Sequence, residues 1–177
     1  MQRMTIKELL AEYAGGKRDF GETDLSEADL FECDLREINL QNSSLKQAYL
    51  PYANLSQANL RGIQFQQAEL SNTQLYAVDL TQANLRQANL SRANLRASRL
   101  AGANLLGANL QNADLRDADL SDADLSYANL CGANLKGAKL VQAELDHCNL
   151  FRVQFIDLTD ARMTHTTVLP NGHMGEG

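Results

Sequence analysis

The amino-acid sequence predicts an all-β solenoid, a fold in which short extended segments stack in successive coils. Two regularities predict it. A large apolar residue stands at every fifth position from Phe20 to Phe155, and the residue two positions before it is small or compact in most repeats. Leu fills 25 of these 28 positions, so the spacing is a property of the whole segment and not of one motif.

A period of five fits neither an α-helix nor a flat β-strand. In a long helix, leucines five residues apart would lie about 140° apart around the axis and would not share a face. In a flat strand, whose period is two, an odd spacing would send alternate leucines to opposite faces. The chain must therefore turn every five residues, with the leucines and the small residues inside and the polar residues outside. Stacked coils would then bury the leucines that one coil cannot bury alone.

Units such as Ala83-Asn84-Leu85 and Ala118-Asp119-Leu120 resemble the repeats of the pentapeptide-repeat family, and the resemblance covers about four-fifths of the chain. It implies a right-handed quadrilateral β-helix in which four pentapeptides form one coil, so that 28 repeats make about seven coils. The five-residue period by itself also allows three repeats per coil.

The open ends of such a stack need covers, because they would otherwise expose leucines and unpaired backbone groups. Residues 1–17 are expected to form an amphipathic helix that caps the N-terminal end. Thr5 and Glu8 have the spacing of a capping box, and Gly15-Gly16 provides the stop. Apolar residues recur between them at helical spacing: Ile6, Leu9, Leu10 and Tyr13.

The β-helix is expected over residues 18–158, and a C-terminal cap and flexible tail over residues 159–177. The five-residue phase breaks after Phe155, because the next apolar residues with inward character are Leu158 and Met163. This end is unusually apolar, and it is interpreted either as a simple cap or as a dimer contact, which makes the protein a monomer or a C-terminal-end dimer. The apolar residues are Phe151, Val153, Phe155 and Ile156.

The composition limits the partners and the compartment. A net charge of −6 and an isoelectric point near 5.0 argue against direct binding of nucleic acid, which needs clustered Lys and Arg. No segment resembles a signal peptide or reaches the roughly 18 apolar residues of a membrane span, so the protein is expected to be soluble and cytoplasmic. Cys33, Cys131 and Cys148 lack CxxC spacing and indicate neither a disulfide framework nor a zinc site. Cys33 and Cys148 occupy inward positions, and Cys131 an outward one.

No combination of residues predicts an enzyme, so no catalytic, cofactor-binding or metal-binding residue is expected. His147, His165 and His173 have no Ser, Cys or carboxylate at a spacing that indicates a site. The glycines form no phosphate-binding loop. Several stand two positions after an inward Leu or Phe, where they suit tight corners: Gly62, Gly102, Gly107, Gly132 and Gly137.

Side chains 20 positions apart would stack on the outside of a rod with 20-residue coils. One such column contains Arg96, Arg116 and Lys136, and three stacked cations should repel one another. They therefore either bind an anion or an acidic partner, or are neutralised locally by Asp114 and Asp117. Local neutralisation is the preferred interpretation.

Charge is banded across the predicted rod rather than striped along it. Residues 19–37 carry eight carboxylates, residues 114–124 carry five, and residues 86–99 between them carry four arginines. Some members of the pentapeptide-repeat family, which this sequence resembles, mimic DNA and inhibit DNA gyrase or protect it from quinolones. Such mimicry requires a negative face along the rod. No outward column is expected to stay acidic for more than one coil, so gyrase-directed DNA mimicry is the alternative function.

The leading prediction is a non-enzymatic scaffold or protein-interaction module with an unknown protein partner. Outward apolar residues near the two ends, Phe31, Pro51, Tyr52 and Phe151, form the expected contact surface. Replacing Phe31 and Phe151 together by Ser is expected to weaken binding without unfolding the chain. Residues 12–20 also resemble the entry into the repeat of many cyanobacterial family members, which implies a source rather than a function.

Overall fold

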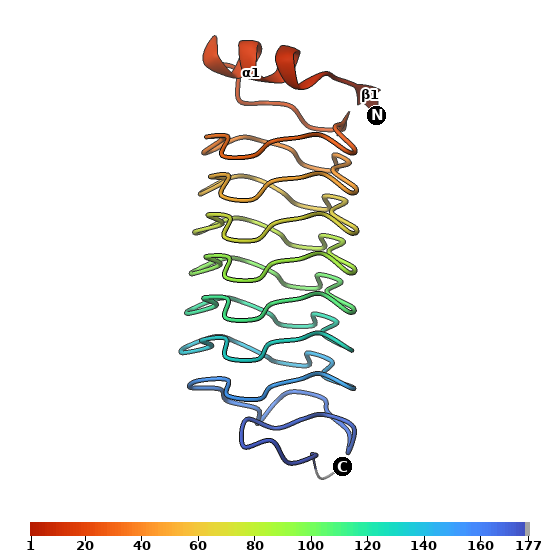
Figure 1. Ribbon diagram of the computed structural model, residues 1–177, viewed down its shortest axis with the longest axis vertical. Helices are drawn as coiled ribbons and strands as arrows, with labels where there is room; N and C mark the ends of the chain where they lie inside the picture. The colour runs from red at the N-terminus through yellow and green to blue at the C-terminus, as the bar shows by residue number, and fades with distance from the viewer. Residues whose placement is uncertain (176–177) are drawn as a thin grey trace.

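The computed structural model describes residues 1–175, and its chain winds into a stack of coils with a helix, α1 (Ile6–Ala14), across one end (Figure 1). Parallel bridges join residues 20 positions apart along the stack, from Asp19 and Asn39 at one end to Asn134 and Gln154 at the other. Because the repeat is five residues long, each 20-residue coil holds four pentapeptides. The alternative of three repeats per coil is therefore wrong.

The sides of the coils are too short to form extended strands. Within residues 1–175 only two strands occur, β1 (Gln2–Arg3) and β2 (Thr23–Asp24), and they pair in parallel. Elsewhere each side contributes one bridged residue between two turns. The N–H of Leu85, for example, donates to the carbonyl of Asn104 at 2.7 Å, and the N–H of Asn104 donates to Ala83 at 2.9 Å. Most of each pentapeptide is needed for the corner, so the predicted β-structure consists mainly of single bridges.

The interior contains the residues that the repeat places there. Every Leu and Phe of the repeat from Phe20 to Leu150 is at most 5% exposed. A few polar residues replace the usual small apolar one, and their hydroxyl groups donate to backbone carbonyls. Ser43 donates to Phe20 at 3.1 Å, and Thr73 donates to Leu50 at 2.9 Å. Because these buried hydroxyls have partners, the polar substitutions do not disrupt the core.

Each corner depends on one residue with left-handed backbone geometry, two positions after the inward Leu or Phe. Throughout the repeat the φ angle of this residue lies between 53° and 74°. Gly adopts this region without the steric cost that other L-residues carry. The prediction that glycines serve the corners is confirmed, since all five have a positive φ. At the other corners a non-glycine residue, such as Ala77 or Ala97, adopts the same conformation.

Replacing Gly107 by Val is expected to lower the free energy of unfolding by about 1–2 kcal/mol. The φ of Gly107 is 67°, and the nearest atom to an added Cβ would be Cγ of Gln87 at 3.6 Å, so the cost comes from the backbone and not from a clash. Denaturant unfolding followed by circular dichroism measures the loss. Gly107→Asn is the control, because Asn tolerates the left-handed region better. Equal losses for Val and Asn would contradict this explanation.

The helix predicted at the N-terminus is α1, and it begins with the predicted capping box. Thr5 Oγ1 accepts a hydrogen bond from the N–H of Glu8 at 3.2 Å, and the Glu8 carboxylate accepts one from the N–H of Thr5 at 2.8 Å. Leu9 is fully buried in the core. The Tyr13 hydroxyl donates to the backbone carbonyl of Arg36 at 2.9 Å, which ties the end of the helix to the first coil.

The apolar stripe of α1 is narrower than the sequence predicted. Ile6, Leu9 and Tyr13 contact the core, but Leu10 is 36% exposed. The three contacting residues have the spacing i, i+3, i+7 and share one face, whereas Leu10 is turned about 100° from Leu9. The helix has nine residues, and nowhere in residues 1–175 is a helix both long and apolar enough to cross a membrane.

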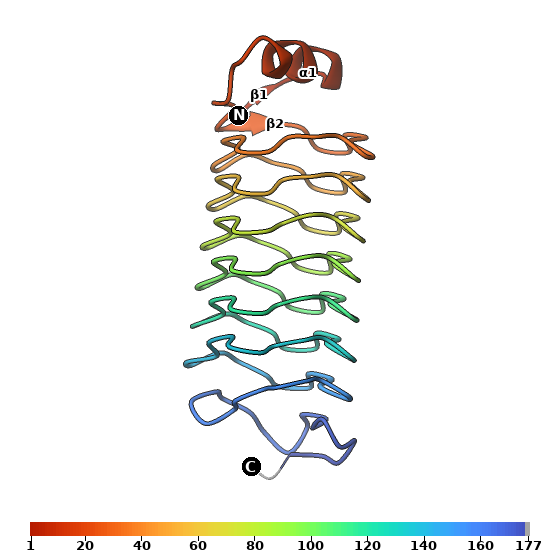
Figure 2. The same cartoon turned by 90° about the vertical axis from the view of Figure 1, so that its left-hand side faces the viewer.

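The last coil is shorter than the others. The final two parallel bridges, from Glu144 to Arg162 and from Asn149 to Val168, span 18 and 19 residues instead of 20. The chain then turns back through an antiparallel bridge between Val168 and Met174, and Figure 2 shows the resulting irregular loops. The phase break predicted at this end is therefore present.

Phe155 is not an inward residue, contrary to the prediction from the repeat. Its side chain is 67% exposed and its φ is 55°. The regular corner residue is Arg152, so a second left-handed residue three positions later directs the chain out of the coil. The inward Leu and Phe positions therefore end at Leu150. Beyond them, Leu158 and Met163 pack against the core and are partly buried.

Candidate functional site

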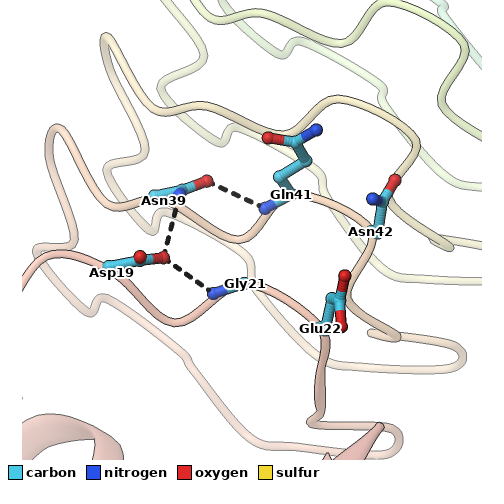
Figure 3. A pocket seen from close by; sticks show the side chains of 6 residues that line it. All are labelled: Asp19, Gly21, Glu22, Asn39, Gln41 and Asn42. Carbon is cyan, nitrogen blue, oxygen red and sulfur yellow. Dashed lines mark hydrogen bonds between the residues drawn. The ribbon is translucent and has the colours of Figure 1, made fainter.

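A polar hollow of about 300 Å³ lies beside the first two coils (Figure 3). Asp19 Oδ1 accepts hydrogen bonds from the N–H of Gly21 at 3.2 Å and from Nδ2 of Asn39 at 2.9 Å. Asn39 Oδ1 in turn accepts from the N–H of Gln41 at 3.1 Å. A bond from a side-chain oxygen to the N–H two residues later stabilises a turn and recurs along the chain. The hollow therefore displays structural hydrogen bonds rather than groups arranged for chemistry.

The three histidines lie on the surface. His147 is exposed, and its ring stacks on Tyr127 with centroids 4.4 Å apart and planes inclined by 13°. His165 and His173 are exposed in the C-terminal segment. In the part of the chain that the structure describes, no group of three or more His, Cys, Asp and Glu residues is placed to hold a metal ion. The role that the contacts assign to His147 is surface packing.

The three cysteines differ in their surroundings. Cys148 is buried in the core, and this burial raises the pKa of its thiol to about 12. Cys33 is half-buried, and its pKa is raised by burial first and by the nearby Asp29 second. Cys131 lies on an outward position and is partly exposed. The predicted inward positions of Cys33 and Cys148 are confirmed, although the first coil covers Cys33 less completely.

At about pH 8, a thiol reagent such as dithionitrobenzoate is expected to label Cys131 in the folded protein and to leave Cys148 unlabelled, since the thiolate is the reactive form. The pKa of Cys148 is raised from 9.0 to about 12 in the folded protein, so its protonated thiol favours the folded state below pH 9.0. This contribution to the free energy of unfolding is lost as the pH rises toward about 12. Cys131→Ser is the control and should remove the fast phase of labelling. Rapid labelling of Cys148 in that variant would contradict its burial.

The column of cations is neutralised in part within its own coils. Arg116 pairs with Asp114 through an ion pair and a hydrogen bond, which lowers the pKa of the Asp114 carboxyl. Lys136 lies 5.9 Å from the ring centroid of Phe155. The pairing of Arg116 agrees with the preferred interpretation of local neutralisation, whereas among the described residues neither Arg96 nor Lys136 forms an ion pair.

The predicted charge bands persist in the 20-residue register, with one exception. The four arginines of residues 86–99 fall on four different sides of one coil. The prediction that no outward column stays acidic for more than one coil is wrong at Asp124 and Glu144, which bridge each other. Glu144 is paired with Arg162 at 3.1 Å, so this pair of carboxylates does not extend into a negative stripe.

Three exposed aromatic side chains form a cluster near the N-terminal end. Phe31, Tyr49 and Tyr52, here called the aromatic patch, are 44%, 46% and 57% exposed. The rings of Phe31 and Tyr49 are stacked, with centroids 6.1 Å apart and planes inclined by 19°. Tyr52 meets Phe31 edge-on, with centroids 6.1 Å apart and an angle of 81°. Adjacent exposed rings of this kind are typical of a contact surface.

The aromatic patch differs from the contact surface predicted from the sequence. Pro51, predicted to point outward, is buried, and Phe151 is half-buried against Gly172 of the C-terminal segment. Phe31 and Tyr52 are exposed as predicted. Tyr49 was missed because it occupies the position before an inward Leu, which is usually Asn or Asp. An aromatic residue at that position was the available signal.

A groove of about 380 Å³ leads from the aromatic patch along the rod. Tyr49 and Tyr52 line its first coil, Glu69 the second and Arg92 the third. Both carboxylate oxygens of Glu69 accept from Nδ2 of Asn89 at 2.9 Å. The groove therefore has aromatic rings at one end and a guanidinium at the other, and it offers a place for an extended segment.

Comparison with known proteins identifies the repeat. The family profile described as pentapeptide repeats matches in eight copies, and the matches together extend over well more than half of the chain. The matched residues are 23–62, 48–87, 79–117, 88–126 and 113–155. No match was found among curated proteins.

Two solved structures place the coil stack among known folds. HetL, a pentapeptide repeat protein involved in heterocyst differentiation regulation from the cyanobacterium Nostoc sp. strain PCC 7120, is 30% identical, with a TM-score of 0.56 over 97% of this chain and 100% of that chain. A trypsin-treated form of QnrB1, a plasmid-mediated fluoroquinolone resistance protein, is 18% identical, with a TM-score of 0.66 over 82% of this chain and 81% of that chain. At 18% identity the second likeness shows the fold alone.

Proposed function

Because this chain belongs to the pentapeptide-repeat family, we propose that it is a non-enzymatic protein-interaction module whose partner docks on the aromatic patch. The observation that carries the proposal is the patch itself, in which three neighbouring aromatic rings are exposed to solvent. Aromatic side chains contribute a large share of the binding energy in protein interfaces. A partner that covers Phe31, Tyr49 and Tyr52 would bury this apolar area.

The coil stack supports the proposal because it holds the patch rigidly. Tyr49 is bridged on one side to Asp29 and on the other to Glu69, so its backbone is fixed between two coils. A preorganised surface loses little conformational entropy when it binds. The proposal takes the rod to be right-handed with about seven coils, in keeping with its family.

The test is affinity capture from a lysate of the source cells with three forms of the full chain. A protein that co-purifies with the wild type is expected to be lost with Tyr52→Ser and retained with Tyr127→Ser. Tyr127 is a matched control, because it is also an exposed tyrosine at a left-handed corner, with φ of 59° against 61° for Tyr52. Identical sets of captured proteins from all three forms would contradict the proposal.

DNA mimicry directed at gyrase is the second candidate function. The acidic first coil favours it, since of its eight carboxylates only Asp34 forms an ion pair among the described residues. The arginines of residues 86–99 weigh against it, because they interrupt all four sides of the rod. Gyrase supercoiling is therefore expected to be unaffected by micromolar protein, with or without a quinolone. Salt-sensitive inhibition or protection would favour mimicry instead.

A further inference from the structure

We propose that the aromatic patch binds an arginine side chain from an extended segment of the partner protein. This inference rests on the proposed function, because it names the chemistry of the partner that docks at Phe31, Tyr49 and Tyr52. Three features carry it. No cation of the described residues lies over the rings of the patch, carboxylates flank the rings, and the adjoining groove has the rings at one end and the guanidinium of Arg92 at the other.

Other aromatic rings near the ends of this rod already hold cations from the same chain. The guanidinium carbon of Arg18 lies 4.0 Å from the ring centroid of Tyr13, and that of Arg152 lies 4.9 Å from Phe151. The ammonium groups of two lysines lie 4.8 Å and 5.9 Å from the rings of Phe20 and Phe155. Within residues 1–175 no Lys or Arg occupies such a position over the aromatic patch. The faces of these exposed rings are therefore open to a cation from outside.

Carboxylates flank the aromatic patch on both sides. Consecutive bridges join Asp29 to Tyr49 and Tyr49 to Glu69, so the tyrosine lies between two acidic residues of one column. Glu32 precedes Tyr52 by 20 residues and lies at the matching corner of the neighbouring coil. In the described part of the chain none of these three carboxylates forms an ion pair within 4 Å. A cation above the rings would meet negative charge that the protein leaves uncompensated.

Arginine fits this arrangement better than lysine. Its planar guanidinium can stack on a ring face while its N–H groups donate to a carboxylate such as Glu32 or Asp29. The ammonium group of lysine is more strongly hydrated and gives up more on leaving water. The combination of rings and carboxylates therefore favours the guanidinium.

The groove gives the bound segment a direction. Arg92 stands two coils beyond Tyr52, and two coil spacings amount to about 10 Å. This is roughly three residues of a polyproline II segment, whose three residues per turn return every third side chain to the same face. A second cation placed there would be repelled by Arg92. The partner segment is therefore expected to carry a glutamate or aspartate three residues from its arginine.

The inference can be tested with the acetylated and amidated hexapeptide Gly-Arg-Gly-Gly-Glu-Gly, titrated into the full chain and followed by NMR. The peptide is expected to shift the ring resonances of the aromatic patch. Its Kd should rise at least about fivefold in Tyr52→Ser and in Glu32→Gln, and stay unchanged in Tyr127→Ser. A peptide with Gln in place of Arg should leave the ring resonances unmoved. Circular dichroism of each variant confirms that the coils remain folded.

An unchanged Kd in Tyr52→Ser would overturn the inference, because it would mean general attraction to the acidic first coil. Ring resonances that do not move would overturn it as well. If Tyr52→Ser nevertheless loses a captured partner, the proposed function stands and the partner uses other chemistry. If the peptide binds at the patch but capture is the same for every variant, the proposed function fails and the arginine site remains.

Discussion

Replacing Leu95 by Ala is expected to lower the free energy of unfolding by about 2–5 kcal/mol. Leu95 is 0% exposed, and its N–H donates to the carbonyl of Asp114 in the next coil at 2.8 Å. The loss combines the removed apolar contact with the cavity that remains. Backbone bridges on both sides hold the coil spacing, so the neighbouring leucines cannot move in to fill the cavity.

Denaturant unfolding followed by circular dichroism measures this loss. Arg96→Ala is the matched control, because Arg96 is the next residue, points outward and is exposed. A surface substitution of this kind is expected to change stability by no more than about 0.5 kcal/mol. A similar loss from both substitutions would mean that Leu95 does not have the buried environment described here.

Replacing Leu9 by Asp is expected to detach α1 and to destabilise the first coil by more than about 3 kcal/mol. Leu9 is the one residue of α1 that is fully buried, and an aspartate there would place an unpaired carboxylate against the core. Detachment would expose the apolar residues of the first coil, including Phe20. Hydrogen exchange of the amides in residues 18–37 is the measurement, and their protection should fall.

Leu10→Asp is the control for this experiment. Leu10 is adjacent in sequence but 36% exposed, so a carboxylate at this position can remain in water. Its effect is expected to stay within about 0.5 kcal/mol. Equal loss of protection in both variants would show that helix propensity, and not the burial of Leu9, holds the cap in place. Because Phe31 belongs to the first coil, loss of the cap should also weaken binding at the aromatic patch.

The candidate surface was only partly predictable. Phe31 and Tyr52 could be assigned to outward positions, because the phase of the repeat decides which residues face solvent. Their clustering with Tyr49 could not be predicted from the phase of the repeat alone. Phe31 is 18 positions before Tyr49 in the sequence, and Tyr52 is three positions after it. They come together because the 20-residue register places Phe31 beside the coil that carries both tyrosines.

The sequence by itself determined the interior, the corners and the first turn of α1. Each depends on interactions within a few residues: the five-residue spacing that puts Leu on one side, the left-handed position that suits Gly, and the contact of Thr5 with Glu8. Such features can be seen in a single repeat or a single helix turn. They need no knowledge of what packs against them.

Only the tertiary structure decided how many repeats close one coil, which face of α1 is buried, and where the inward repeat ends. A five-residue period describes one corner, whereas the coil closes only when four corners bring residue i beside residue i+20. At the ends one neighbouring coil is missing, so the repeat no longer dictates the position of each side chain. That is why Leu10 and Phe155 are exposed although their positions in the pattern predicted burial.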